Sequence, residues 1–512
     1  MSVSHHNGIR VEWRNRESMS DEEFKECANL FSEHYGIWGM FSGQLAGKRI
    51  RLSAAELGRR LAPSGTSALL AYADRQLVGQ AFSLQSIIPN QVRVTWVTQL
   101  VVHEDWRHRG IATRLLNSIW AFSNDFAWGL VTANPLTVRA SEKTTRRRCT
   151  PKVIRKHLKA LGRVCNDIEY VKGKELCVDE ERSKVNTEFH IDHSPIEELK
   201  RQYPRKWRLG SLEEGEEWLA FTFGEQRQAA WSREDLESAL QNSESILREA
   251  YQRMNLDACH GWAQHAPQEV EFVENVVALS MPATVVDFGC GHGRHVLEFA
   301  KRGCECHGVD FLRGAIEKAR ERLDTCSELA VTFSSGDCRS IDLGQQFDLG
   351  LCVYDVVGSY ADDAENRKLL QNVAKHVREG GFLVLSVMNM ELTAAIAKQA
   401  GDVYDNPHLL QELEPADIMQ KTGNVFDPNH FLIDSESDIV YRKEQFSEDG
   451  LPSSELIVRD RRYRREDVLK MCAEIGFEPI LCRYVQAGRW EKELHATDVK
   501  AKEILFIGRK TS

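Results

Sequence analysis

The first third of the chain alternates between helical and extended patterns of hydrophobic and polar positions. The stretch from Met19 to Tyr35 opens with Ser20 and three acidic residues, the pattern of a helix N-cap and first turn. Strand-type runs follow at Ala68–Ala73, Leu77–Leu84 and Val92–His103. We therefore expect a mixed α/β domain, with one further helix running to about Phe122.

The middle of the chain carries a weaker pattern. Residues 166–230 are polar over long stretches, show little periodicity and are punctuated by Pro195 and Pro204. We expect a linker or a docking extension here.

Residues 231–512 repeat an order of strand and helix. Two helical stretches, Ser232–Met254 and Gln268–Leu279, lead into a strand at Thr284–Phe288 and a helix at Arg294–Arg302. Further strands are expected at Cys306–Val309, Val331–Ser334, Phe347–Val353, Phe382–Met388, Glu478–Arg483 and Ile504–Gly508. This alternation predicts a mostly parallel, doubly wound sheet with helices on both faces.

Length and composition agree with a chain of several α/β domains. A chain of 512 residues is too long for one ordinary core, and the patterns divide it at 1–165, 166–230 and 231–512. The composition, 42% hydrophobic and 28% charged, is that of a soluble globular protein. The formal net charge of -10 gives no overall attraction to nucleic acid or to an anionic membrane.

The sequence indicates a cytoplasmic location. No apolar run approaches the roughly 18–20 residues that span a bilayer, and the first residues lack the apolar segment of a signal peptide. The 13 cysteines are scattered, with no CxxC pair. We therefore expect reduced thiols, no disulfide framework and no metal site. Nothing in the pattern indicates an oligomeric state.

A glycine-rich segment, Asp287-Phe-Gly-Cys-Gly-His-Gly293, lies between a predicted strand and a predicted helix. Glycines let a ligand approach the backbone closely, and a helix start offers free N–H groups at the edge where such sheets bind ligands. The next strand ends in Asp310, where a carboxylate can take both hydroxyls of a ribose. The strand after it is followed by Asp337 and Cys338, which suit the amino group and the ring of adenine.

These motifs together resemble the class I S-adenosylmethionine (SAM)-dependent methyltransferases over about residues 240–512. The run Phe347-Asp-Leu-Gly-Leu-Cys-Val-Tyr-Asp355 looks like the fourth strand of that family, and Glu379-Gly-Gly-Phe-Leu-Val-Leu385 like the turn into its fifth. A Rossmann domain that binds NAD is the alternative. The single-residue spacing of the three glycines and the Gly-Asp pair favour the methyltransferase.

The resemblance implies SAM as a cofactor. The residues implied to hold it are Gly289, Gly291 and Gly293 for the methionine part, Asp287 for the loop or the amino group, Asp310 for the ribose, Asp337 and Cys338 for the adenine, and Tyr251 as a lid. Tyr354 and Asp355 follow the fourth strand, are implied to face the transfer site and are the candidate catalytic residues.

The segment after the fourth strand also bears on the acceptor. Methyltransferases of this family that act on DNA or protein amides carry Asn/Asp-Pro-Pro-Tyr there, whereas this chain has Tyr354-Asp-Val-Val-Gly-Ser-Tyr360. The difference favours a small-molecule acceptor. Positioning supplies much of the rate of such an in-line transfer. His265 and His292 are candidate bases, with a role as polar wall residues as the alternative.

A second motif, Gln99-Leu-Val-Val-His-Glu-Asp-Trp-Arg-His-Arg-Gly-Ile-Ala112, joins an apolar strand to a helix through a basic turn. Backbone N–H groups and arginines in such a turn suit a pyrophosphate. Arg107, Gly110 and Ala112 match the Arg/Gln-x-x-Gly-x-Gly/Ala signature of the GNAT acetyltransferase superfamily, and the predicted elements over about 10–165 resemble it in order.

The GNAT resemblance implies acetyl-CoA as a second cofactor, with its thioester between two separating strands. The residues implied to hold it are Arg107, Arg109, Gly110 and Ala112 at the pyrophosphate, Leu100 and Val102 along the pantetheine arm, and Asn134 after the fifth strand. Glu104 is a candidate general base, with a purely structural strand end as the alternative. Ser141 stands where the family often has a tyrosine that protonates the CoA thiolate, so a CoA-sensing or structural domain stays open.

Two basic stretches, Arg139–Arg163 and Arg459–Arg465, admit two interpretations. They could form a groove for RNA, or they could be solvated helix faces, with the first contacting the 3′-phosphate of CoA. The acidic balance of the whole chain favours the second interpretation, which makes nucleic acid the less favoured partner.

The sequence as a whole predicts a bifunctional cytosolic transferase. It combines SAM-dependent methyl transfer, with a small-molecule acceptor, and acetyl-CoA-dependent N-acyl transfer. The alternatives are a methyltransferase whose first domain binds CoA or regulates without catalysis, and an RNA-modifying enzyme. The acceptors are expected to contact the loops around Gly36–Arg51 and Asn389–Val458.

Overall fold

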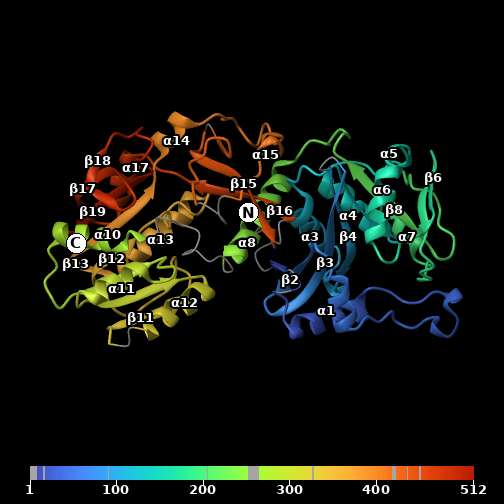
Figure 1. The fold of residues 1–512 in the computed structure, drawn as a ribbon, viewed down its shortest axis with the longest axis horizontal. Helices are drawn as coiled ribbons and strands as arrows, with labels where there is room; N and C mark the ends of the chain where they lie inside the picture. The colour runs from blue at the N-terminus through green and yellow to red at the C-terminus, as the bar shows by residue number, and fades with distance from the viewer. Residues whose placement is uncertain are drawn as a thin grey trace. The chain divides into compact units, whose positions relative to one another are not determined.

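The computed structural model describes residues 9–511 apart from 15, 17, 90–91, 204–205, 252–263, 326–327, 418–422, 435 and 449–450, and also leaves out the side chains of 244–251, 446–448 and 451–454. The chain forms two compact units. The first comprises Met1–Glu249 and Gln445–Ile457, and the second comprises Ala250–Glu444 and Val458–Ser512. Their elements can be followed along the chain by colour in Figure 1.

An eight-stranded sheet organises the first unit, in the order β1-β2-β3-β4-β5-β8-β7-β6. Its strands are β1 (Ile9–Arg14), β2 (Thr66–Ala73), β3 (Gln76–Ile88), β4 (Val92–Val102), β5 (Ala127–Thr132), β6 (Leu176–Val178), β7 (Ser183–Asn186) and β8 (Glu216–Phe223). Neighbouring strands are antiparallel, except for β4 and β5, which run parallel. The mixed α/β fold predicted for this region is therefore confirmed.

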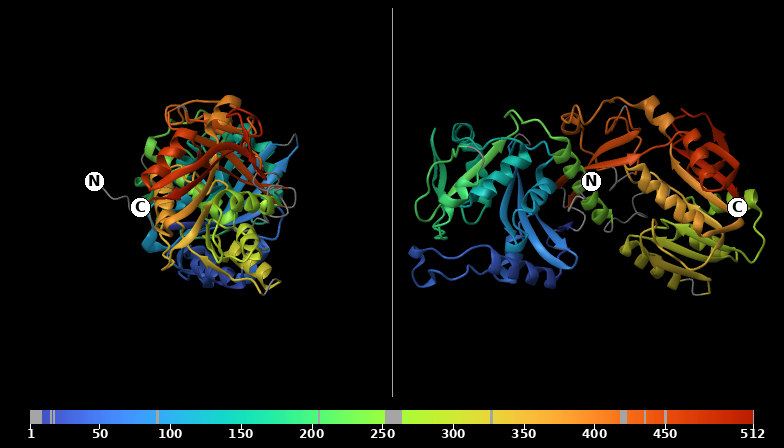
Figure 2. Two further views of the ribbon diagram at one scale, coloured as in Figure 1. Left: turned by 90° about the vertical axis from the view of Figure 1, so that its left-hand side faces the viewer. Right: turned by 180° about the vertical axis from the view of Figure 1, so that it is seen from behind.

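Helices cover both faces of this sheet, as Figure 2 shows from two further directions. An added Cβ at Gly79 of β3 would lie 2.6 Å from Ile111 of α3. Phe82, on the opposite face of the same strand, packs in one core cluster with Phe31 of α1. The helices are α1 (Asp21–His34), α2 (Ala54–Arg60), α3 (Ile111–Trp120), α4 (Pro135–Thr145), α5 (Pro151–Lys156), α6 (Leu158–Val164), α7 (Ile196–Arg201) and α8 (Arg233–Tyr251), with 3-10 turns at Met40–Leu45, Glu104–Trp106 and Cys165–Asp167.

Strands β4 and β5 separate towards their carboxyl ends. Their pairing runs from Val94 opposite Ala127 to Val97 opposite Leu130 and then stops, although both strands continue. The pairing of β4 with β3 also shifts by one residue beside Thr98, a bulge that bends a strand away from its neighbour. The result is an opening in the middle of the sheet.

Residues 166–230 differ from the expected linker, because they contain β6, β7 and β8. Strand β8 pairs along β5 and extends the sheet. Its run from Trp218 to Phe223 is buried throughout, and a short continuous apolar run of this kind is a recognisable strand signal. The polar stretches on either side of it form turns and the short edge strands.

The second unit is built on another eight-stranded sheet, in the order β11-β10-β9-β12-β13-β19-β17-β18. Its strands are β9 (Thr284–Phe288), β10 (Glu305–Asp310), β11 (Val331–Ser335), β12 (Phe347–Cys352), β13 (Val377–Met388), β17 (Phe477–Gln486), β18 (Arg489–Leu494) and β19 (Glu503–Lys510). Strands β9 to β13 are parallel, and β19 runs antiparallel between β13 and β17. The strand order reverses at β9 and β12, where such sheets bind ligands.

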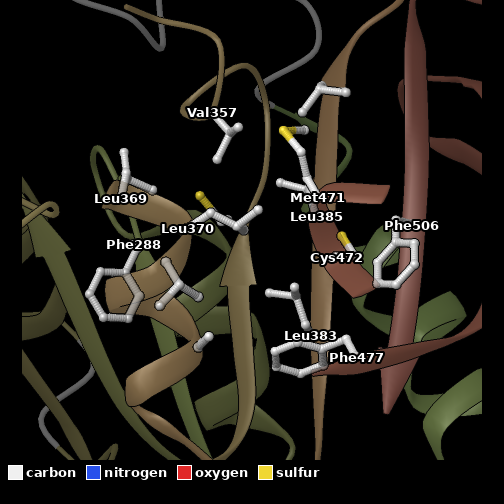
Figure 3. Close-up of a cluster of buried hydrophobic side chains, with 14 of the residues drawn as sticks. Phe288, Val357, Leu369, Leu370, Leu383, Leu385, Met471, Cys472, Phe477 and Phe506 are labelled. Atoms are coloured by element: carbon white, nitrogen blue, oxygen red, sulfur yellow. The ribbon is translucent and has the colours of Figure 1, made fainter. Parts of the chain in front are cut away.

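Helices on both faces enclose the core of the second unit, which confirms the doubly wound fold. Figure 3 shows one face, where Leu369 and Leu370 of α13 and Met471 of α17 converge on Leu383 and Leu385 of β13. The helices are α10 (Ala266–Val277), α11 (Arg294–Lys301), α12 (Arg313–Asp324), α13 (Asp363–Lys375), α14 (Met390–Ile396), α15 (Leu409–Glu412) and α17 (Arg465–Glu474). None of the helices in the described part of the chain is long and apolar enough to cross a membrane.

A small three-stranded sheet lies between β13 and α17 in the sequence. Its strands are β14 (Phe431–Ile433), β15 (Ile439–Glu448) and β16 (Leu451–Arg461). It falls within the segment 389–458, where acceptor loops were expected.

Candidate active sites

A cavity of about 750 Å³ lies in the first unit where β4 and β5 separate. The start of α3 lines it on one face of the sheet. Tyr35 and Gly36, at the end of α1, line it on the other face together with Ile191 and Asp192. Because α1 and α3 cover opposite faces, the cavity passes through the gap between the two strands.

The first backbone N–H groups of α3 lie at this cavity. Gly110, Ile111, Ala112 and Thr113 line it, and no side chain caps the helix. Gly110 has a φ of +79°, and an added Cβ there would meet no atom within 4 Å. An uncapped helix start beside open space fits a pyrophosphate. The structure thus brings the predicted residues Gly110 and Ala112 together.

The two predicted arginines differ in position. Arg107 lines the cavity, and its guanidinium donates hydrogen bonds to the carbonyls of Val102 (3.3 Å) and His34 (2.5 Å). Arg109 is not among the residues that line the cavity, and its guanidinium lies 4.8 Å from the centre of the Trp106 ring. Arg107 is therefore the better placed of the two to contact a phosphate.

Leu100, Val102 and Asn134 line the same cavity from the ends of β4 and β5. Leu100 pairs with Ala81, on the face covered by α3, so it lies on the side from which a pantetheine arm would enter. The Asn134 side-chain oxygen accepts a hydrogen bond from the Leu136 N–H (2.9 Å) and caps α4. All three thus lie at the cavity, and their contacts with a CoA arm stay predictions.

The candidate general base and proton donor are less favourably placed. The Glu104 side chain is 53% exposed, and its carboxylate lies 3.8 Å from His34 Nδ1. Burial, with a further contribution from the charge of His103, lowers the pKa of His34. Ser141 is fully buried and does not line the cavity, and its hydroxyl has no hydrogen-bond partner in the described part of the chain. Ser141 is thus not placed to donate a proton there.

Two buried polar residues that the sequence patterns left without a role also line the cavity, Gln99 and Glu217. Each is 5% exposed. Neither amide atom of Gln99 has a hydrogen-bond partner among the described residues. Glu217 accepts a hydrogen bond from the Thr187 hydroxyl (2.8 Å). Burial raises the pKa of Glu217 to about 7, against the opposing effect of that hydrogen bond. An acidic residue at the start of an apolar strand is the sequence signal that could have identified Glu217.

In the second unit, the glycine loop has the conformation that its sequence requires. Gly289, Gly291 and Gly293 all have positive φ, between +54° and +80°. An added Cβ at Gly289 would lie 2.4 Å from Val356, and one at Gly293 would lie 2.7 Å from Phe333. At Gly291 nothing lies within 4 Å, so the backbone is open to a ligand at this point.

Two buried carboxylates flank this loop. Asp287 is 1% exposed, its Oδ1 has no partner among the described residues, and burial raises its pKa to about 6. Asp310 accepts hydrogen bonds from the N–H groups of Gly291 and Leu312, both at 2.8 Å. An orphaned carboxylate oxygen fits the ammonium group of SAM, and Asp310 retains lone pairs for ribose hydroxyls.

The residues predicted for the adenine occupy different surroundings. Asp337 forms an ion pair with Arg339 (2.5 Å), whose guanidinium lies 4.7 Å from the centre of the Tyr360 ring. Cys338 is buried in the hydrophobic core, and burial raises the pKa of its thiol to about 12. The side chain of Tyr251 lies outside the described residues. Contacts of these residues with an adenine stay predictions.

Tyr354 and Asp355 form a strained turn at the end of β12. Their φ angles are +62° and +59°, in the left-handed region that side chains rarely adopt. The Tyr354 N–H donates to the hydroxyl of Ser386 (2.8 Å), and Arg294 stacks 4.1 Å from the centre of the Tyr354 ring. Contacts on several sides thus hold this turn at the edge of the sheet where the glycine loop lies.

Glu269 of α10, which sequence reasoning missed, holds Tyr354 in place. It is 1% exposed and accepts hydrogen bonds from the Tyr354 hydroxyl, His295 Nε2 (2.8 Å) and the Gly488 N–H (2.8 Å). Burial alone would raise its pKa, but the hydrogen bond and charge of His295 lower the pKa overall. Glu269 therefore joins α10, α11, the turn after β12 and the β17–β18 turn.

A further acid is buried at this edge of the sheet. Glu503 is 7% exposed and burial raises its pKa to about 8, whereas Asp355 is exposed. One carboxylate oxygen of Glu503 has no hydrogen-bond partner among the described residues. The nearby guanidinium groups of Arg442 and Arg462 are held by Asp460, at 2.7 and 2.9 Å. The site thus contains carboxyl groups suited to an acceptor that carries protons or positive charge.

The two candidate histidines differ in burial. His265 is half-buried, and its ring lies against Gly488, where an added Cβ would approach it to 2.4 Å. His292 is buried, and its backbone carbonyl accepts a hydrogen bond from Arg322 (3.4 Å). Their roles as bases or as wall residues stay predictions.

Arginines of both basic stretches are engaged within the protein. Arg147 is buried, donates to the carbonyls of Thr145 (2.9 Å) and Gln226 (3.2 Å), and stacks on Trp128 at 4.7 Å. Arg462 is fully buried beside Asp460. Charges held in this way are not displayed to a polyanion.

Two family models match the chain. The Acetyltransferase (GNAT) family matches residues 29–136, and a Methyltransferase domain matches residues 285–381. The first range contains the gap between β4 and β5, and the second contains the glycine loop and both candidate catalytic residues. The predicted fusion of a GNAT domain with a methyltransferase domain is confirmed.

Relatives with a known activity are similar to parts of the chain. A dTDP-4-amino-2,3,4,6-tetradeoxy-D-glucose N,N-dimethyltransferase of Saccharopolyspora spinosa is 27% identical over 134 residues, 25% of this chain and 51% of the relative. An mRNA cap guanine-N(7) methyltransferase of Schizosaccharomyces pombe is 27% identical over 124 residues, 22% of this chain and 34% of the relative. The chain thus spans about half or less of the length of these two relatives.

Among solved structures, the CcbJ methyltransferase of Streptomyces caelestis is similar, with a TM-score of 0.37 and 18% sequence identity, covering 48% of this chain and 90% of that one.

Proposed function

We propose that this chain, which joins a GNAT-family acetyltransferase domain to a SAM-dependent methyltransferase domain, is a bifunctional transferase that acts on small molecules. The first unit would transfer an acetyl group from acetyl-CoA to an amine, and the second would transfer a methyl group from SAM. The observation that carries the proposal is that each unit has an open glycine beside free backbone N–H groups, at the place where its family binds the cofactor.

In the acetyltransferase unit, acetyl-CoA supplies an activated thioester. The N–H groups at the start of α3 and the guanidinium of Arg107 would hold its pyrophosphate. The strand edge at Leu100 and Val102, which β5 leaves unpaired, would take the pantetheine arm. A cavity that passes through the sheet supports this arrangement, because it lets an acceptor approach the thioester from the face opposite the CoA.

In the methyltransferase unit, SAM supplies a methyl group on a sulfonium centre. Asp287 would take the ammonium group, Asp310 the ribose, and Gly291 would lie against the methionine part. Tyr354, fixed by Glu269, would form a wall of the transfer site. Such rigid positioning is the main contribution a protein makes to an in-line transfer from a good leaving group.

The acceptor of methyl transfer is proposed to be a small molecule with an amino group. The buried acid Glu503 supports this, since a carboxyl group with a pKa near neutrality can bind an ammonium group or take its proton. An N,N-dimethyltransferase of an amino sugar among the relatives agrees with it. A second candidate, a first unit that binds CoA without catalysis, is favoured by the buried position of Ser141.

Isothermal titration of the full chain with acetyl-CoA and with SAM tests both sites at once. Gly110→Glu places a carboxylate at the helix start and should weaken acetyl-CoA binding by at least about 100-fold, since like charges repel at close range. SAM binding should not change. Asp310→Asn should weaken SAM binding and leave acetyl-CoA binding unchanged. Failure of the wild-type chain to bind acetyl-CoA would overturn the acetyltransferase assignment, and failure to bind SAM would overturn the other.

A further inference from the structure

One end of the cavity in the first unit is lined by two buried polar residues, Gln99 and Glu217, to which the sequence patterns gave no role. We propose that Glu217 and Gln99 form the acceptor end of the cavity, and that Glu217 binds the ammonium group of a small primary amine and removes a proton from it. The inference rests on the proposed acetyl transfer and adds to it the acceptor class and the base.

Both residues lie on the side of the sheet opposite the CoA site. Gln99 pairs with Phe82, and paired residues of adjacent strands share a face, so Gln99 lies on the face covered by α1. Glu217 is in β8, beside β5, and its charge interacts with Tyr35 at the end of α1. Since the start of α3 is on the other face, an acceptor held here would approach the thioester across the gap between β4 and β5.

The charge of Glu217 has no counterpart among the residues that the structure describes. None of the ion pairs formed by the described residues includes it, and its hydrogen bond comes from the neutral hydroxyl of Thr187. Tyr35 is neutral as well, because burial and then the charge of Glu217 raise the pKa of its phenol. A buried, uncompensated carboxylate is costly. The missing positive charge is the one that an ammonium group would bring.

Gln99 supplies independent evidence for a ligand at this end. Its side chain is 95% buried and lines the cavity, yet neither its amide oxygen nor its amide nitrogen has a partner among the described residues. A buried amide without partners costs roughly 1–3 kcal/mol, and such groups are rare in native proteins unless a ligand or water meets them. Its oxygen can accept a second hydrogen bond from the same ammonium group.

Glu104, the base expected from the sequence, is less suited to this task. It follows β4 at the cavity mouth, half exposed, in the same turn as Arg107. That turn adjoins the start of α3, where the pyrophosphate would lie. Glu217 is instead buried at the far end of the cavity.

The reaction then balances as follows. Glu217 takes one proton from the ammonium group, and the nitrogen lone pair forms a bond with the carbonyl carbon of the acetyl thioester. The carbon–sulfur bond breaks, and the sulfur leaves with the electron pair. The second proton lost from nitrogen ends on the CoA sulfur, and Glu217 releases its proton to water. The products are an N-acetyl amine, CoA and one proton.

The test uses the full chain with acetyl-CoA and four probes, namely n-butylamine, putrescine, galactosamine and, as a neutral control, 1-butanol. Release of the CoA thiol gives kcat/KM, and titration gives the Kd of acetyl-CoA. Glu217→Gln should lower kcat/KM for the amines by at least about 100-fold, the usual contribution of a general base, and leave the Kd within about twofold. Gln99→Leu should lower kcat/KM by about tenfold through KM. Glu216→Gln is the matched control, because Glu216 pairs with Lys184 and does not line the cavity.

The outcomes separate this inference from the function on which it rests. In the wild-type chain, kcat/KM for an amine should rise between about pH 6 and 8, and Glu217→Gln should abolish that rise. If the wild-type chain acetylates an amine and Glu217→Gln keeps the rate within about threefold, the role of Glu217 is refuted and acetyl transfer stands. If acetyl-CoA binds but only 1-butanol is acetylated, the amine site is refuted. If acetyl-CoA does not bind, the acetyltransferase function itself fails.

Discussion

The burial of Glu217 has a measurable consequence for stability that does not depend on any substrate. Its pKa is raised by burial from an ordinary 4.5 to about 7. The folded first unit therefore binds this proton more tightly than the unfolded chain. The stabilisation is complete below about pH 4.5 and is lost as the pH rises through about 7. Glu217→Gln removes the titrating group and should make the first unit less sensitive to pH over this window.

The magnitude follows from the two pKa values. Their difference is about 2.5, and each unit of pKa corresponds to about 1.4 kcal/mol, so the wild-type chain should lose about 3 kcal/mol relative to Glu217→Gln between pH 4.5 and 8. In a unit of roughly 250 residues, each kcal/mol shifts the unfolding midpoint by about 2–4 °C. The difference between the two midpoints should therefore change by about 6–12 °C.

Scanning calorimetry of the full chain at a series of pH values measures this change. The transition that shifts on addition of acetyl-CoA identifies the first unit. Glu216→Gln removes a carboxyl group from the same strand outside the cavity and controls for the loss of one charge. If the midpoints of the wild-type chain and Glu217→Gln differ by the same amount at pH 5 and pH 8, Glu217 is already compensated and the reasoning is refuted.

Three further predictions concern the second unit. Gly291→Ala puts a side chain at a φ of +54°, which costs about 1–2 kcal/mol. Titration should show SAM binding weakened by about tenfold or more. Unchanged SAM affinity would show that this part of the backbone does not contact the cofactor. Tyr354→Phe removes the hydroxyl that donates a hydrogen bond to Glu269. The kcat of methyl transfer should fall by about tenfold, with little change in the Kd of SAM. If SAM affinity falls as much as kcat, the substitution has instead disrupted the glycine loop. Glu503→Gln removes a carboxyl group whose pKa is raised by burial to about 8. In calorimetry, the stability of this variant relative to the wild-type chain should therefore increase from pH 5 to pH 8. A stability difference that does not change with pH would contradict the burial of Glu503.

The sequence was sufficient where a function depends on residues that are close together in the chain. The glycine loop, its strand and its helix lie within 20 residues, and each residue type has a local physical reason. The same is true of the basic turn that ends at Gly110. Asp310 could be predicted as well, because parallel strands end at the same edge of a sheet and the acid follows directly after its strand.

The sequence was insufficient where a residue acts through partners far along the chain. Glu217 lies in a segment whose polar flanks predicted a linker. Only the pairing of its strand β8 with β5, some 90 positions earlier in the chain, makes this residue part of the cavity. Glu269 is one acid among several on an amphipathic helix until Tyr354, His295 and Gly488 converge on it. Ser141 stands at the expected position in the sequence, and its burial away from the cavity is a result of helix packing.

The sequence by itself thus determined the two families, their cofactor loops and, outside residues 166–230, most of the strand–helix order, because these depend on local backbone chemistry and on periodic burial. Only the tertiary structure decided which side chains line the proposed acceptor sites. Strand pairing and helix packing bring together residues from distant parts of the chain, and the loss of water around them is what leaves Glu217 and Gln99 with unmet charge and hydrogen-bonding capacity.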